Sequence, residues 1–130
     1  MKLEHIGIAM KSIEEGAKFW EDVLGLTPEA ITEFKSQKVR VAVFDARGVK
    51  IELLEPMGDD SPIAKFLEKK GEGLHHLCFE VKNLEKALMD IKSRGIKLVD
   101  EVPRRGAFAK KIAFLHPRSI HGVLIELCEE

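Results

Sequence analysis

The chain carries two stretches in which apolar and polar residues alternate, and the second stretch repeats the first. They span residues 2–10 and 74–81, and each holds a histidine at the matching position, His5 and His76, a shift of 71 residues (5 to 76). Alternation of this kind places successive side chains on opposite faces and is typical of a half-buried β-strand. We therefore predict a strand at each stretch, with the two histidines at equivalent places.

A second pair of strand-like stretches repeats in the same way. Residues 49–55 and 123–129 share an order of apolar and acidic residues in which Glu52 matches Glu126, a shift of 74 residues (52 to 126). Self-similarity at a fixed spacing indicates that a chain is built from copies of one unit. The sequence thus predicts a duplication in which each half opens with a histidine-bearing strand and closes with a glutamate-bearing strand.

Apolar residues at helical spacing follow each histidine-bearing strand. Ser12 and Glu15 have the spacing of a capping box and predict a helix over residues 12–24. Asn83 is the expected N-cap of an equivalent helix that ends near residue 93. The other expected elements are strands at 26–34, 39–43, 96–99, 110–115 and 122–128, a loop at 102–109, and a short helix capped by Ser61 within 56–73.

Strand alternation also sorts the side chains of the four repeated strands by face. His5, Glu52, His76 and Glu126 fall on the face opposite the helices, whereas the helix-facing side is apolar. The approximate two-fold symmetry of a duplicated fold would bring these four side chains to one centre. Separate structural roles for each of them are the competing interpretation. The small neighbours on the same face, which we expect to leave room for a ligand, are Gly7, Ala9 and Cys78.

Two imidazoles and two carboxylates suit a divalent metal ion of borderline hardness. We expect Co²⁺ first, with Mn²⁺, Ni²⁺, Fe²⁺ and Zn²⁺ as alternatives. The expected fold class is therefore α+β, with two tandem βαβββ modules forming a curved mixed sheet around a metal-binding cup. We expect a single domain over 1–130, with the first module at 1–55, a linker with its short helix at 56–73, and the second module at 74–130.

Charge and cysteine usage narrow the classes of partner. The formal net charge of −1, from 21 basic and 22 acidic residues, gives no overall field that favours nucleic acid or an anionic membrane. No apolar run is long enough for a membrane span, and a strand that starts beside Met1 leaves no room for a signal peptide. Cys78 and Cys128 form no CxxC pair, so we expect reduced thiols in a cytoplasmic protein.

Five segments carry a more specific pattern than the four side chains alone. They are EHIGIA at 4–9, IELLEP at 51–56, GLHHLCFEV at 73–81, KIAFLHPRS at 111–119 and GVLIELC at 122–128. With them the chain resembles the vicinal oxygen chelate superfamily, which includes glyoxalase I, bleomycin-resistance proteins and extradiol dioxygenases. Within that superfamily it is most similar to the methylmalonyl-CoA epimerases, and the resemblance runs from His5 to Glu129.

The resemblance implies an enzyme that interconverts (R)- and (S)-methylmalonyl-CoA by removing the C2 proton through a metal-stabilised enolate. It also implies that Glu126 is both a metal ligand and a catalytic base. The family places a second carboxylate on the strand around Val41, where this chain has no acid. The side chains that remain open for the second proton relay are Glu52, which we take as the second catalytic residue, Glu33, Glu55 and His116.

The resemblance further implies an acyl-CoA substrate and a homodimer. Lys110, Lys111 and Arg118 are the candidate contacts for the CoA phosphates or the free carboxylate, although a solvated basic edge explains them equally well. Two other functions remain open. One is a glyoxalase I-type lactoylglutathione lyase with the same ligand set, and the other is a non-catalytic small-molecule binding protein of the same fold.

Overall fold

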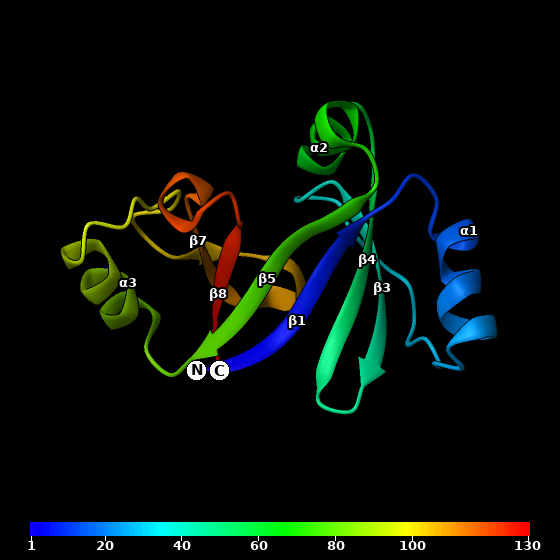
Figure 1. Cartoon of the computed structure of the whole chain (residues 1–130), viewed down its shortest axis with the longest axis horizontal. Helices are drawn as coiled ribbons and strands as arrows, with labels where there is room; N and C mark the ends of the chain where they lie inside the picture. The colour runs from blue at the N-terminus through cyan, green and yellow to red at the C-terminus, as the bar shows by residue number, and fades with distance from the viewer. The chain divides into compact units, whose positions relative to one another are not determined.

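The computed structural model describes residues 1–130 apart from the side chain of Ala109, and Figure 1 follows the chain from end to end. The chain forms two compact units, a first unit of residues 5–75 and a second unit of residues 1–4 and 76–130. The predicted βαβββ order occurs twice, so the duplication is confirmed. No helix in the described part of the chain is long and apolar enough to cross a membrane.

The first unit is a four-stranded sheet with one helix from the module and one from the linker. The strand order is β2-β3-β4-β1, in which β1 and β4 are parallel and the other pairs are antiparallel. Its elements are β1 (Lys2–Ala9), α1 (Ile13–Lys18), the π-helix η1 (Phe19–Val23), β2 (Thr32–Phe34), β3 (Val39–Ala46), β4 (Val49–Pro56) and α2 (Pro62–Lys70).

The second unit repeats this arrangement. The strand order is β5-β8-β7-β6, in which β5 and β8 are parallel and the other pairs are antiparallel. Its elements are β5 (Gly73–Val81), α3 (Leu84–Ser93), β6 (Arg104–Arg105), the 3-10 helix η2 (Ala107–Ala109), β7 (Lys111–Leu115), the 3-10 helix η3 (Pro117–Ile120) and β8 (Ile125–Glu129).

Each module helix packs on one face of its own sheet. In the first unit Ile8, Ile51 and Leu53 contact the side chains of α1, which lies beside β3 in Figure 1. In the second unit Phe79, Ile125 and Leu127 pack with the buried residues of α3. The predicted apolar, helix-facing side is therefore present in both units, and burial of these side chains supplies the main driving force for packing.

A glutamate at the end of the last strand fixes the start of each module helix. Glu55 accepts a hydrogen bond from the backbone N–H of Ile13 at 2.9 Å, and Glu129 accepts one from that of Leu84, also at 2.9 Å. The first N–H groups of a helix lack partners within the helix, so a carboxylate there satisfies a donor and complements the helix dipole. The predicted N-caps are also confirmed at Ser12, Ser61 and Asn83.

Three predicted elements differ from the structure. The strand expected over 26–34 is reduced to β2 and an isolated bridge between Pro28 and Phe44, because proline has no N–H to offer a ladder. The helix expected over 12–24 is α-helical only to Lys18 and continues as a π-helix.

The strand expected over 96–99 is wrong, since only Leu98 forms a bridge, to Leu115. The second strand of the second module is instead β6, which lies inside the predicted loop and in which Arg104 pairs with Ile112. Leu98 is apolar because it packs into the α3 core, where it is 8% exposed, and not because it belongs to a strand.

Candidate metal centre

The first unit brings His5 and Glu52 together. In the parallel pair of β1 and β4, Gly7 lies opposite Glu52, and His5 precedes Gly7 by two residues on the same face. The His5 Nδ1 and Glu52 Oε2 atoms lie 3.4 Å apart, and each side chain is 9% exposed. His5 and Glu52 are therefore a buried imidazole and a buried carboxylate in contact.

The second unit brings His76 and Glu126 together in the same register. Cys78 lies opposite Glu126 across the parallel pair of β5 and β8, and His76 precedes Cys78 by two residues. The His76 Nε2 and Glu126 Oε1 atoms are 3.1 Å apart, and the two side chains are 7% and 10% exposed. The same arrangement of a histidine and a glutamate on adjacent parallel strands therefore occurs in both units.

The chemistry of these donors fits a divalent cation. A buried carboxylate is costly unless a cation, hydrogen bonds or a metal compensates for the lost hydration. Each unit offers one imidazole nitrogen and one carboxylate oxygen from adjacent strands, and His5 and Glu52 belong to a cluster whose atoms are spaced for ligation. Nitrogen and oxygen donors of this kind suit ions such as Co²⁺, Mn²⁺, Ni²⁺, Fe²⁺ and Zn²⁺.

The space expected beside the small residues is partly filled. Ala9 is fully buried with Leu54 under Ile63 of α2, so the linker helix covers that end of the face in the first unit. Cys78 is fully buried in a cluster with Ile112 and Cys128 in the second unit. The prediction that Ala9 and Cys78 leave room for a ligand is therefore wrong.

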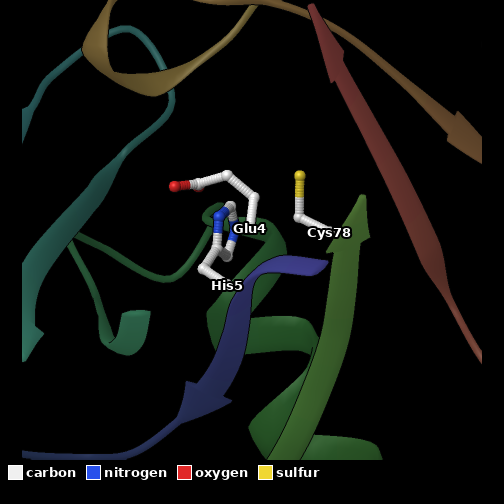
Figure 2. Close-up of side chains that lie close together, drawn as sticks. All are labelled: Glu4, His5 and Cys78. Carbon is white, nitrogen blue, oxygen red and sulfur yellow. The ribbon is translucent and has the colours of Figure 1, made fainter. Parts of the chain in front are cut away.

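Cys78 is a packing residue and not a nucleophile. The hydrogen bond that the Cys78 thiol donates to the Cys128 sulfur, burial and the nearby Glu126 carboxylate together raise the pKa of Cys78 far above its usual range, which keeps Cys78 a thiol. Figure 2 shows Cys78 with Glu4, whose carboxylate oxygen lies within 4.8 Å of the Cys78 sulfur. An acidic neighbour disfavours a thiolate further.

The three predicted substrate-binding cations occupy different places. Lys110 lies near Glu80, at 3.5 Å from Nζ to Oε2, and near Cys128. Burial lowers the pKa of Lys110, but the charges of Cys128, Glu4 and Glu80 outweigh it and hold the pKa above its usual value. Since residues 80 and 128 share the face of Glu126, Lys110 belongs to the side of the candidate ligands.

Lys111 and Arg118 lie elsewhere in the second unit. Lys111 forms ion pairs with Glu85 of α3 and, at 3.7 Å, with Glu129, so it belongs to the helix side of the sheet. Arg118 is exposed on η3, where its backbone N–H donates to His116 Nδ1 at 3.0 Å. Of the three, only Lys110 is placed beside the candidate ligands.

The alternatives for the second proton relay are placed away from Glu52. Glu55 holds the start of α1 and pairs with Arg40 at 2.7 Å. Glu33 pairs with Arg40 at 3.6 Å on the α1 side, because Arg40 also contacts Glu14. Val41, at the position where the resemblance expects an acid, is 1% exposed and packs in the core beneath α2, so no carboxylate stands there. His116 caps η3.

Comparison with known proteins now identifies the class. Residues 4–114 match the pattern of the Glyoxalase/Bleomycin resistance protein/Dioxygenase superfamily, and the chain belongs to this family. Within it, the mitochondrial methylmalonyl-CoA epimerase of Homo sapiens is 40% identical over 127 residues, which cover 97% of this chain and 72% of the human protein.

Two further proteins are similar to this chain over nearly its whole length. The uncharacterized protein YqjC of Bacillus subtilis (strain 168) is 49% identical over 98% of this chain and 91% of its own length. A variant of Streptomyces coelicolor methylmalonyl-CoA epimerase in complex with 2-nitronate-propionyl-CoA has a TM-score of 0.91, with 33% identity over 100% of this chain and 94% of that one. The chain is thus a homologue of methylmalonyl-CoA epimerases, and the predicted fold class is confirmed.

Proposed function

We propose that this protein is a divalent-metal-dependent epimerase that interconverts (R)- and (S)-methylmalonyl-CoA. The observation that carries the proposal is the buried imidazole–carboxylate pair built twice in one register, His5 with Glu52 and His76 with Glu126. Homologous epimerases that match nearly the whole chain support the same substrate class.

The four side chains are proposed to hold one ion together, with Co²⁺ as the first candidate. With one shared ion, the two modules, 1–55 and 74–130, and the linker would act as one functional domain. A divalent ion held in this way supplies positive charge near the thioester oxygen, where negative charge develops as the C2 proton leaves. Because the side chains of Glu52 and Glu126 are only 9% and 10% exposed, little water reaches them, and their electrostatic interactions are stronger than they would be in water.

Proton transfer is assigned to the two carboxylates. Glu126 would accept the C2 proton from one face of the substrate, and the flat enolate that results would take a proton on its other face from Glu52, which begins this direction of the reaction in its protonated form. Exchange of protons with water would restore the starting state, and the reverse reaction would use the two groups with their roles exchanged. Two groups are required because inversion at carbon needs removal and return of the proton on opposite faces. Glu52 takes the second role because Glu33, Glu55 and His116 are engaged elsewhere.

Two further features belong to the proposal. Lys110 is the preferred contact for an anionic group of the acyl-CoA, because it lies on the face of Glu126, whereas Lys111 and Arg118 are weaker candidates. A homodimer is supported by the exposed apolar side chains that follow β1, of which Phe19, Val23 and Leu24 are 51%, 68% and 50% exposed, because such side chains favour burial against a partner. The proposed cytoplasmic location is supported by the free thiols of Cys78 and Cys128.

The test follows a single epimer of methylmalonyl-CoA by chiral analysis, with metal-stripped protein and the same protein reloaded with Co²⁺. We expect epimerisation by the reloaded protein to exceed that of the stripped protein by about 100-fold or more, because loss of charge stabilisation at an oxyanion has effects of that size. A hemithioacetal of glutathione is the control substrate. Turnover of the hemithioacetal alone would contradict the proposal in favour of a lyase, and tight metal binding without either reaction would leave a binding protein.

A further inference from the structure

Phe114 lies next to both candidate metal ligands of the second unit. It lies directly opposite Glu126 in the antiparallel pair of β7 and β8. Its ring also meets the imidazole of His76 edge to face, with centroids 5.9 Å apart and planes at 81°. One aromatic side chain is therefore in contact with the candidate histidine and in register with the candidate glutamate.

Asp100 and Arg104 contact Phe114 and each other. The Arg104 guanidinium lies over the Phe114 ring at 5.4 Å from the centroid, and Arg104 Nε donates to Asp100 Oδ1 at 3.0 Å. The other oxygen of Asp100 accepts a hydrogen bond from the backbone N–H of Phe114 at 2.8 Å. The Asp100 side chain is only 16% exposed. Through these two hydrogen bonds, this largely buried carboxylate holds both the backbone of Phe114 and the guanidinium that covers its ring.

The first unit lacks an aromatic residue at the equivalent position. Glu52 lies opposite Val43 in the pair of β3 and β4, as Glu126 lies opposite Phe114. The histidines differ in parallel with this change, since His5 faces its glutamate through Nδ1 and His76 faces its glutamate through Nε2. An imidazole is free to present either nitrogen, and the contacts of its ring decide which one is presented.

We propose that Phe114, clamped by Asp100 and Arg104, is a positioning residue that sets the ring orientation of His76 and so presents Nε2 toward Glu126. The inference rests on the proposed metal centre but assigns residues that do not themselves touch the ion or the substrate. Edge-to-face packing fixes the plane of an imidazole, and the cation–π contact resists movement of the Phe114 ring.

The test compares Phe114→Val, which copies the residue of the first unit, with Phe79→Val. Phe79 lies on the same strand as His76 but packs on the α3 side, so its substitution removes equal volume without touching the imidazole. Arg104→Ala is the milder variant, since this side chain is 48% exposed and its loss leaves the core intact. Two readouts are needed: the ¹⁵N resonances of the His76 ring in metal-stripped protein, and the dissociation constant for Co²⁺ by chelator competition.

We expect Phe114→Val to shift the His76 ring resonances and to weaken Co²⁺ binding by about 10–100-fold, the range for groups that orient metal ligands. Arg104→Ala should shift the same resonances in the same direction by less. Phe79→Val should leave both readouts near the wild type. His76 resonances that are unchanged in Phe114→Val, or in Arg104→Ala if the former does not fold, would overturn the inference, as would equal Co²⁺ affinities in the two valine variants. Neither readout needs turnover, so failure of the epimerase assignment is scored separately.

Discussion

Glu126→Gln is expected to slow epimerisation by about 10²–10⁴-fold, the usual contribution of a general acid–base group. Glutamine keeps the size of the side chain and a carbonyl oxygen that can still ligate, but the amide cannot accept the C2 proton. The fold should be retained, because the substitution adds no volume to a tightly packed strand pair. Turnover is measured with methylmalonyl-CoA at saturating Co²⁺, and folding by thermal unfolding.

The matched control for this change is Glu129→Gln. Glu129 lies on the same strand and faces α3, where an amide oxygen can still accept the hydrogen bond from Leu84. We expect it to retain wild-type turnover within about two-fold, since it contacts no reacting group. An undiminished rate in Glu126→Gln would remove Glu126 from the proton transfer and with it the mechanism proposed here.

His5→Ala is expected to have the largest effect on metal affinity. It removes a nitrogen donor and leaves the buried Glu52 carboxylate without its imidazole neighbour at 3.4 Å. Removal of groups that merely orient ligands weakens binding by about 10–100-fold, so loss of a ligand should weaken Co²⁺ binding by more than about 100-fold. The measurement is competition with a chelator of known affinity, on folded protein.

His121→Ala is the control for that measurement, because His121 is exposed at the end of η3 and belongs to neither pair. We expect His121→Ala to bind Co²⁺ like the wild type. Equal affinities of the two alanine variants would show that His5 is not a ligand, and the proposed four-residue centre would then be wrong.

The duplication and the two pairs follow from local patterns and could be predicted. The strands of His5 and His76 show alternation, and the match of Glu52 with Glu126 needs only a comparison of the halves. The caps at Ser12 and Asn83 depend on neighbours within three residues, so they too are local. The strands and the caps are therefore set by residues close in sequence, whereas the two pairs follow from the match between the halves.

Two failed predictions in the second unit concern tertiary contacts. Residues 96–99 have the composition of a strand, yet Leu98 packs with the buried residues of α3. The sequence around Leu98 does not reveal that contact. Arg104 pairs with Ile112 because β7 offers a free edge, although the sequence there is polar and contains proline and glycine. Tertiary pairing overrides intrinsic β-propensity in this way.

In the candidate site, too, some positions could be predicted from the sequence and others depend on tertiary contacts. Lys111 could have been assigned to the helix side by extending strand alternation, because it directly precedes Ile112 on β7 and faces Glu85. The space beside Ala9 could not be judged, since Ile63 reaches it from the linker helix. Phe114 has the pattern of an ordinary core residue, and only its contacts with His76 and Arg104 distinguish it.

Metal-dependent removal of the C2 proton is measured by uptake of solvent deuterium at C2 of methylmalonyl-CoA in D₂O. Metal-stripped, Co²⁺-reloaded and Co²⁺-reloaded Glu126→Gln protein are compared by mass spectrometry of the recovered thioester. With the single epimer whose C2 proton Glu126 accepts, we predict rapid exchange only in the reloaded wild type, because that proton passes to the Glu126 carboxylate and the ion stabilises the enolate that is left. Exchange that is absent from the reloaded wild type, or equally fast in the stripped protein, would contradict metal-dependent proton abstraction at that carbon.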